Sequence, residues 1–188
     1  PGLSDVADAL EQAVLDHKRV LVFGDFDLDG ISATTVLTRG LRALGCCAMP
    51  FIPRRFEEGY GVTAAAYERA KQHEPDLIVT VDCGIANKHE VAAIVADGTP
   101  VAVTDHHEAS ELVPEGIPVA DPKLGDGCPS EILAGVGVAL KLVQMLGARR
   151  GFPHLWRGYT DFATLGTVAD LMPMRGENRA LVADGLRR

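Results

Sequence analysis

The stretch RVLVFGDFDLDGISATTVLTRGLRALG (Arg19–Gly45) joins an apolar run, an acidic loop and a helical pattern. Arg19–Phe23 is typical of a buried strand, and apolar residues recur at helical spacing over Ile31–Leu44, directly before a glycine that favours helix termination. Further strands are expected at Cys46–Ile52, Asp76–Val81 and Pro100–Val103, and further helices at Thr63–His73, at Asn87–Asp97 and, with Ser4 as N-cap, over Val6–Val14. This βαβ rhythm predicts an α/β fold, a parallel sheet flanked by helices that binds ligands beyond the carboxyl ends of its strands.

The alternation of strands and helices breaks after Pro118. Three later segments have helical patterns: Glu131–Leu146, Thr160–Leu171 and Glu177–Leu186. We therefore expect an α/β sheet portion over about residues 1–120 and a mainly helical C-terminal part over residues 121–188 that closes the site.

Composition limits the class of protein. Of 188 residues, 47% are apolar, and no apolar run approaches the ~20 residues of a membrane span, so we expect a globular chain with no membrane partner. The four cysteines show no CxxC spacing, which favours a reducing, cytoplasmic location over a disulfide framework. The chain opens on PGLSD without a leader and stops inside a helical pattern, so we expect a fragment of a longer protein.

Three alternating aspartates, Asp25, Asp27 and Asp29, follow the first expected strand. Carboxylates this close repel one another and destabilise a half-buried loop unless a cation neutralises them, and oxygen ligands favour Mg²⁺ or Mn²⁺. The alternatives are a solvated acidic turn and a calcium loop, but the calcium loop needs a Glu where Val36 stands. If this cluster lies in one metal site, the net charge of −8 does not exclude a nucleic-acid partner.

Two further motifs stand at the ends of expected strands. Asp82 lies in TVDCGI, and Thr104–Glu108 reads TDHHE. In a parallel sheet both would lie beside Asp29, near enough for Asp82 to bridge two ions, although an Asp near a Gly also forms turns. The imidazoles shift the metal preference from Mg²⁺ toward Mn²⁺. Asp170, in TVADLMPM, is by its spacing alone an ordinary surface carboxylate.

The order and intervals of DFDLDG, VDCG, DHH and VADLMP resemble the four motifs of the DHH phosphoesterase superfamily. Over nearly the whole chain the sequence resembles the RecJ branch of that superfamily, a resemblance carried also by IPRRFEEGYG (Ile52–Gly61), LAGVGVALKL (Leu133–Leu142) and LGTVADLMPMRGENRALV (Leu165–Val182). Sister branches typically carry a His four residues before the middle Asp of the first motif. Here Phe23 stands at that place, and Asp25 offers the extra ligand instead, which favours the RecJ branch.

The resemblance implies the metal-dependent phosphodiesterase core of a 5′→3′ single-stranded-DNA exonuclease that releases mononucleotides in DNA repair and recombination. It also implies a second, downstream domain that this chain does not contain. We expect two Mn²⁺ or Mg²⁺ ions, the first held by Asp29, Asp82, His106 and Asp170 and the second by Asp25, Asp27 and Asp82. Asp105 would orient an imidazole, and His107 would contact the substrate or donate a proton to the leaving oxygen.

Basic residues suggest how a single strand could bind. Arg54 and Arg55 begin an expected loop near Phe56 and Tyr60, an arrangement suited to phosphate pairing and base stacking, or they pair with Glu57 and Glu58. Arg179 could reach the site near Asp170, or it caps and pairs the last helix. The glycines of GVG (Gly135–Gly137) could cradle a phosphate or permit close helix packing.

Two other functions stay open at this point. One is a phosphodiesterase of the same superfamily that acts on short oligonucleotides or cyclic dinucleotides. The other is a non-catalytic interaction module, which loss of ligand residues would mark, and none is missing here.

Overall fold

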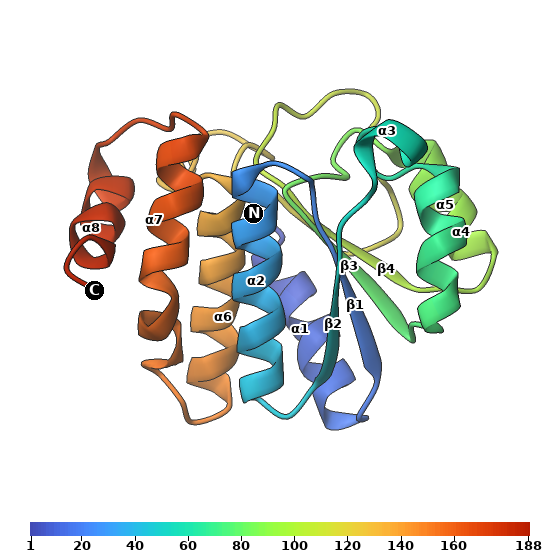
Figure 1. Ribbon diagram of the computed structural model, residues 1–188, viewed down its shortest axis with the longest axis horizontal. Coiled ribbons are helices and arrows are strands. Elements are labelled where there is room, and N and C mark those ends of the chain that lie inside the picture. Colours follow the sequence, from blue (N-terminus) through green and yellow to red (C-terminus); the bar gives the residue numbers. More distant parts are fainter.

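The computed structural model describes residues 1–188 as a parallel five-stranded sheet of order β2-β1-β3-β4-β5 with helices on both faces (Figure 1). The strands are β1 (Arg19–Phe23), β2 (Cys47–Phe51), β3 (Leu77–Val81), β4 (Val101–Thr104) and β5 (Val119–Ala120). The α-helices are α1 (Leu3–Leu15), α2 (Leu28–Ala43), α3 (Arg55–Glu58), α4 (Ala64–Ala70), α5 (Lys88–Ala96), α6 (Gly135–Arg149), α7 (Thr160–Ala169) and α8 (Gly176–Gly185). Two 3₁₀ helices are η1 (Lys71–His73) and η2 (Leu155–Tyr159). The predicted α/β class is confirmed.

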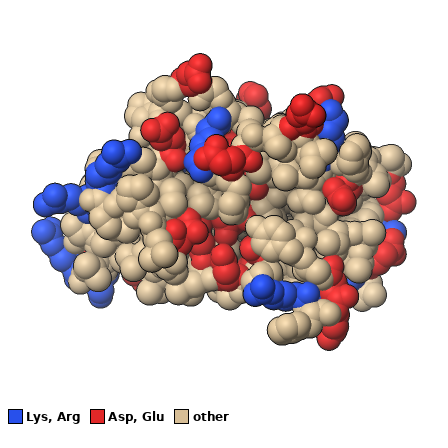
Figure 2. Space-filling view, turned by 90° about the horizontal axis from the view of Figure 1, so that it is seen from above, with Lys and Arg blue, Asp and Glu red and all other residues tan.

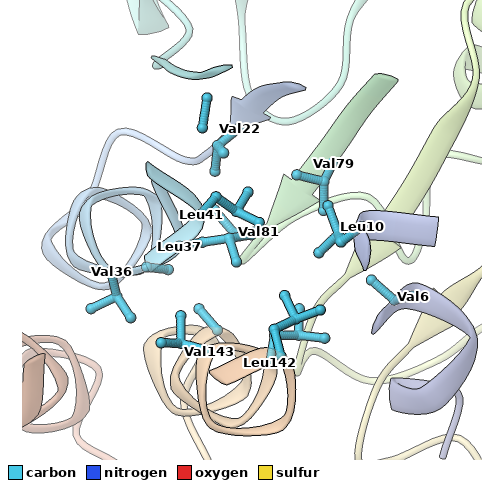
Figure 3. Packing of buried hydrophobic residues seen from close by; sticks show 14 of the residues in the cluster. Val6, Leu10, Val22, Val36, Leu37, Leu41, Val79, Val81, Leu142 and Val143 are labelled. Carbon is cyan, nitrogen blue, oxygen red and sulfur yellow. The ribbon is translucent and has the colours of Figure 1, made fainter. Parts of the chain in front are cut away.

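The pleat of the strands divides the core into two layers. In β1, Val20 and Val22 enter the cluster shared with α1, α2 and α6, whereas Leu21 and Phe23 enter the cluster shared with α4 and α5. Figure 3 shows the first cluster, in which Leu41 lies beside Val81 and Leu10 beside Val79. The central strands β1, β3 and β4 are buried on both faces, so their sequences are nearly continuous apolar runs, whereas the edge strand β2 is partly exposed.

The C-terminal helices extend the α2 side of the sheet. α6 lies against α2, closely enough that a Cβ on Gly40 would come within 2.4 Å of Val143 Cγ2. α7 contacts both α2 and α6, and α8 packs outside α7, so the four helices stand side by side in Figure 1. This arrangement brings the end of α7 to the edge of the sheet where the acidic loops lie. None of the helices is long and apolar enough to cross a membrane.

Three local predictions were wrong. Ser4 is not the N-cap of α1, which begins after Gly2 in a left-handed conformation (φ 69), and the Ser4 hydroxyl instead accepts a hydrogen bond from Arg149. Arg55 does not begin a loop but the short helix α3. The strand pattern does not end at Pro118, because the two residues of β5 pair with β4. A strand this short carries no periodicity that a sequence could reveal.

Candidate metal centre

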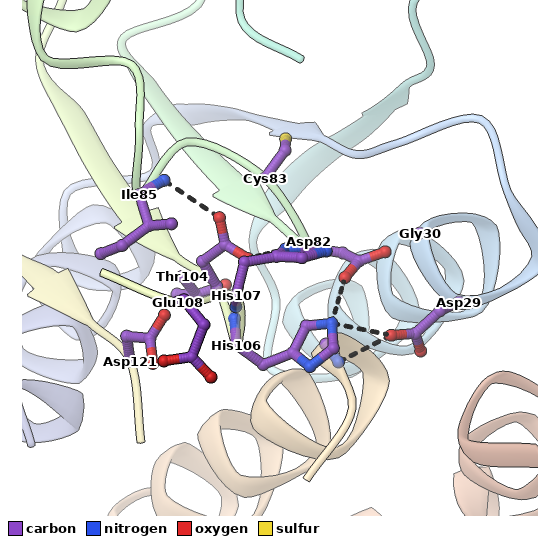
Figure 4. A network of polar contacts seen from close by, with 12 residues as sticks. Asp29, Gly30, Asp82, Cys83, Ile85, Thr104, His106, His107, Glu108 and Asp121 are labelled. Atoms are coloured by element: carbon purple, nitrogen blue, oxygen red, sulfur yellow. Dashed lines mark hydrogen bonds and ion pairs between the residues drawn. The ribbon is translucent and has the colours of Figure 1, made fainter. Parts of the chain in front are cut away.

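Four segments bring acidic and imidazole side chains to the carboxyl edge of the sheet. The loop after β1 carries Asp25 and Asp27, the first turn of α2 carries Asp29, and Asp82 and His106 follow β3 and β4. Asp105 and His107 flank this histidine, and Asp170 follows the last residue of α7. Figure 4 shows the imidazole of His106 between the carboxylates of Asp82 and Asp29. The helical C-terminal part thus completes a cluster that the sheet begins.

The potential ligand atoms form three groups, and within each group all atoms lie within 4.8 Å of one another. The groups are Asp29, His106 and Asp170; Asp25, Asp27 and Asp82; and Asp82, His106 and His107. The first two groups agree with the predicted division of ligands between two ions, and the last two place Asp82 between them. The third group makes His107 an additional candidate ligand. The roles of the individual residues stay predictions.

Asp29 is held by the N-terminus of α6. Its carboxylate is 2% exposed and accepts hydrogen bonds from the backbone N–H of Gly135 at 2.7 Å and of Val136 at 3.0 Å. A helix N-terminus favours a negative charge, because its first N–H groups lack partners within the helix. A carboxylate of the chain itself therefore occupies the N–H groups that a phosphate at Gly135–Gly137, one of the two alternatives for this motif, would need.

Glycines let backbone and carboxylates approach closely here. A Cβ on Gly135 would lie 2.4 Å from Asp82 Oδ1, and a Cβ on Gly166 would lie 2.4 Å from Asp29 Oδ1. Any larger residue would displace a candidate ligand. The other interpretation of the GVG motif was close helix packing, but the close neighbour of Gly135 is Asp82 after β3 rather than another helix.

Burial and mutual repulsion disfavour the charged forms of the central carboxylates. Burial and the charge of Asp82 raise the pKa of Asp29 to about 7, and burial and the charge of Asp27 raise the pKa of Asp82 to about 8. Burial also raises the pKa of Asp25. Asp82 has a left-handed backbone (φ 61), a conformation that costs free energy for a non-glycine residue and recurs at functional sites. A cation among these carboxylates would offset their repulsion.

The unpartnered atoms of the cluster test whether a metal fits. His106 Nε2 and Asp82 Oδ1 are 3.1 Å apart, and both are buried, yet neither has a hydrogen-bond partner. The same nitrogen lies 3.8 Å from Asp29 Oδ2 and 3.6 Å from Asp170 Oδ2. Donor atoms from four segments therefore face one point without satisfying one another. This set of carboxylate oxygens and an imidazole nitrogen fits Mn²⁺ well and Mg²⁺ acceptably.

Asp105 contacts the imidazole of His107. Its Oδ1 lies 2.6 Å from His107 Nδ1, and its Oδ2 accepts a hydrogen bond from the N–H of Ile85 at 3.0 Å. The bond to Asp105 raises the pKa of His107 to about 9, which favours a protonated imidazole at neutral pH. The His107 side chain is 46% exposed, so it faces the solvent side of the centre, where a substrate would arrive.

Asp121 is a buried acidic residue that the sequence interpretation missed. It follows β5 as Asp105 follows β4, and it is 1% exposed. Its Oδ1 accepts a hydrogen bond from the N–H of Lys123 at 2.7 Å, while burial raises its pKa to about 6. Figure 4 shows it beside Glu108. The only sequence feature that could have indicated it is its position after the apolar pair Val119–Ala120, and two residues are too few to be recognised as a strand.

The predicted substrate-binding arginines lie around the centre rather than in it. Arg54 forms an ion pair with Glu57 at 2.9 Å, as expected if these arginines pair with the neighbouring glutamates. Arg55 instead stacks over the ring of Phe26, 4.4 Å from its centroid. Arg179, on α8, is exposed and has no ion pair. Figure 2 shows acidic groups in the middle of this face and a group of basic side chains at its left end.

Comparison with known proteins agrees with these motifs. The DHH family, N-terminal domain, matches residues 19–167. The single-stranded-DNA-specific exonuclease RecJ of Thermus thermophilus is 44% identical over 189 residues, which span all of this chain but only 28% of that protein. A crystal structure of exonuclease RecJ bound to manganese aligns with 100% of this chain and 48% of its own at a TM-score of 0.91 and 42% identity. The T. thermophilus RecJ in complex with Mg²⁺ aligns with 100% of this chain and 23% of its own at a TM-score of 0.67 and 34% identity. The motifs, the fold and this match together show that the chain belongs to the DHH family.

Proposed function

We propose that the chain is the catalytic core of a metal-dependent 5′→3′ exonuclease that degrades single-stranded DNA to mononucleotides and acts in DNA repair and recombination. The observation that carries this proposal is the convergence of unpartnered His106 Nε2 and Asp82 Oδ1 with the carboxylates of Asp29 and Asp170. The similarity to RecJ exonucleases of known structure supports the choice of substrate class.

Two Mn²⁺ or Mg²⁺ ions, when bound, would supply a water of lowered pKa and stabilise the charge on the attacking and leaving oxygens. The residues of the chain prepare the site for this chemistry. The N-terminus of α6 holds Asp29, and the left-handed turn at Asp82 aims its carboxylate between the two ligand groups. Asp105 binds Nδ1 of His107, which leaves Nε2 free to donate a proton to the leaving oxygen.

The same structure supports a path for the strand. Arg55 and Phe26 stack beside Asp25, and the ring of Tyr60 lies edge-on to Phe26 with a centroid distance of 6.0 Å. Bases could stack on this aromatic pair while Arg54, Arg55 and Arg179 contact phosphates. Of these, Arg54 is the weakest candidate, because Glu57 already pairs with it.

The proposed activity also involves parts of the protein outside this chain. We infer that residues 1–188 form one catalytic domain and that a further domain outside this chain supplies part of the groove, since the chain spans 28% of its T. thermophilus relative. All four cysteines are free thiols, which supports a reducing, cytoplasmic compartment.

The alternative substrates can be separated in one experiment. The protein with Mn²⁺ is incubated with a 5′-labelled strand, a 3′-labelled strand, a linear dinucleotide and a cyclic dinucleotide. We expect the 5′ label to appear at once as a mononucleotide, while the 3′-labelled strand shortens stepwise. Faster cleavage of either dinucleotide would favour the short-oligonucleotide alternative. No cleavage of any substrate by protein that binds Mn²⁺ would favour the non-catalytic module.

A further inference from the structure

One exposed residue at the rim of the metal centre has no part in the chemistry described above. Leu171 directly follows the candidate ligand Asp170, and its side chain is 89% exposed. Its backbone is left-handed (φ 55). The backbone N–H of Leu171 bonds to the carbonyl of Val168 and that of Met172 to the carbonyl of Thr167, both at 3.2 Å. This is the pattern with which helices end at a left-handed residue, most often a glycine.

Folding gains little from a leucine at this position. A left-handed backbone disfavours a residue with a Cβ, and an exposed apolar side chain forgoes the free energy of burial. Glycine would satisfy the same hydrogen bonds at lower cost. A leucine here therefore lowers the stability of the fold in two separate ways, and a role in binding would explain why it stands at this position.

The loop that carries Leu171 is held in place. Asn178, fully buried in α8, donates hydrogen bonds to the carbonyls of Pro173 at 3.2 Å and Ile132 at 2.5 Å. These bonds fix the segment between α7 and α8 to the segment before α6. Leu171 is thus presented on a defined turn.

Leu171 has acidic, apolar and basic residues near it, which could contact a metal-bound phosphate, a base and further phosphates of one strand. Asp170, its neighbour, has Oδ2 3.6 Å from His106 Nε2 in the centre that would receive the scissile phosphate. Leu28 and Ile31, on either side of Asp29, are 47% and 44% exposed on α2, the helix that α7 packs against. Beyond Leu171, Arg175 and Arg179 are exposed and form no ion pair. Exposed apolar residues therefore flank two candidate ligands, Asp29 and Asp170, and two exposed arginines follow Leu171 along the chain.

We propose that Leu171 packs against the base of the nucleotide next to the scissile phosphate and so positions the strand in the centre. The proposal rests on the proposed function and adds to it a specificity contact. Leucine, isoleucine and methionine side chains pack on base faces in other nucleic-acid complexes, where they replace the lost base stacking. The guanidinium groups of Arg175 and Arg179 match the charge of the following phosphates, which favours a strand over an apolar protein partner at this rim.

The test pairs a residue change with removal of the base. Leu171→Asn keeps a residue that tolerates the left-handed backbone but removes the apolar surface, and Leu171→Gly restores the residue that this turn favours. Leu186→Asn is the matched control, because Leu186 is 77% exposed at the far end of α8. Each protein with Mn²⁺ is assayed on a strand with all its bases and on strands abasic at the terminal or the penultimate nucleotide. Anisotropy of the same strands with Ca²⁺ measures binding without relying on turnover.

We expect both Leu171 variants to lower kcat/KM and affinity on the complete strand by about tenfold, the order of a lost base contact. On one of the abasic strands the variants and the parent should differ little, because the contact is already gone. Melting temperature should be unchanged or higher in Leu171→Gly, and Leu186→Asn should match the parent throughout.

Equal losses on complete and abasic strands would overturn the base contact and indicate that another protein segment covers Leu171. Weaker Mn²⁺ binding in Leu171→Asn would overturn it too, and would mean that Leu171 holds Asp170. Failure of the parent to cleave or bind any strand is a separate result, visible before any variant is made, and would overturn the proposed function together with this contact.

Discussion

At the scale of single residues, Asp82 combines three features that recur at functional sites. It has a left-handed backbone, a carboxylate that is 2% exposed, and a pKa raised to about 8 by burial and the charge of Asp27. The sequence pattern TVDCG identified the residue but left a turn-forming role open. The structure adds that Asp82 Oδ1 is buried without a partner beside His106, a feature that a turn residue would not have.

Replacing Asp82 with Asn should separate chemistry from folding. Asn tolerates the left-handed backbone and keeps the shape of the side chain, but it removes the charge. Mutating a residue that only hydrogen-bonds to a metal ligand lowers metal affinity or activity by about 10- to 100-fold. Because Asp82 is itself a candidate ligand, we expect Asp82→Asn to lower kcat/KM by more than about 100-fold. The melting temperature of the metal-free variant at pH 8 should equal or exceed that of the parent. A clearly lower melting temperature without metal would show that Asp82 mainly serves the fold.

Asp121 gives a residue-scale prediction on pH. Its pKa in the folded chain is raised by burial to about 6, above the usual 3.8 of an aspartate, so its contribution to stability is present below pH 4 and is lost as the pH rises through about 6. Asp121→Asn removes this loss and keeps the oxygen that accepts from Lys123. We expect the variant to be more stable than the parent at pH 7.5, by at most about 3 kcal/mol, and no more stable at pH 4. Denaturant melts at both pH values measure this, and a gain at pH 4 equal to that at pH 7.5 would refute the titration of Asp121.

At the scale of elements, the start of α6 matters most for the site. The first two N–H groups of this helix bind Asp29, and Gly135 lies against Asp82. One helix end thus positions a ligand from each of two ligand groups. The sequence showed that the glycines were unusual, but the nature of their neighbour, a carboxylate rather than a phosphate, depends on the packing of α6 against α2.

Gly135→Ala should therefore damage metal binding more than folding. Its Cβ would lie 2.4 Å from Asp82 Oδ1, whereas a Cβ on Gly158 would meet no atom within 4 Å, so Gly158→Ala is the matched control. We expect the affinity for Mn²⁺, measured by titration calorimetry, to fall by about tenfold or more in Gly135→Ala. The control should bind as the parent does. Equal affinities in all three proteins would mean that Asp82 does not ligate the metal.

At the start of α3, the neighbouring residues Arg54 and Arg55 make different contacts. Arg54 is paired with Glu57, while Arg55 stacks on Phe26 and forms no ion pair. We expect Arg55→Ala to weaken binding of a long single strand and to reduce the slope of log affinity against log salt by about 1, and Arg54→Ala to change both less. Hydrolysis of a dinucleotide should change little in either variant. An unchanged salt slope in both would leave them as ordinary surface charges.

At the scale of the whole molecule, the candidate metal centre draws residues from both parts of the chain. Asp29 and Asp82 belong to the sheet portion, while the helix that binds Asp29 and the helix that ends at Asp170 belong to the C-terminal part. With pKa values of about 7 and 8, both carboxylates prefer the neutral form in the folded chain. Their contribution to stability is therefore present at low pH and is lost as the pH rises from about 4 through about 8.

The metal should reverse this loss. We expect Mn²⁺ to raise the melting temperature more at pH 8 than at pH 5, because the ionised carboxylates bind it more tightly; at 100 times its Kd a ligand adds about 2.7 kcal/mol. Excess EDTA should abolish both the stabilisation and the hydrolysis of DNA. Thermal melts and cleavage assays with and without chelator test this. Undiminished hydrolysis in EDTA would exclude the metal-dependent mechanism.

The sequence by itself determined the α/β class, the positions of its main strands along the chain and most of the candidate donor residues, because apolar periodicity and acidic residues after strands are local patterns. Asp170 was recognised only through its family motif, since a single aspartate at a helix end carries no such pattern. Tertiary structure alone decided that β5 pairs with β4, that Asp121 is buried, and that α6 binds a carboxylate. These features depend on contacts between distant residues, such as Asp29 and Gly135, 106 positions apart. No local preference encodes which partner a helix N-terminus meets, and only the packed fold brings that partner within hydrogen-bond distance.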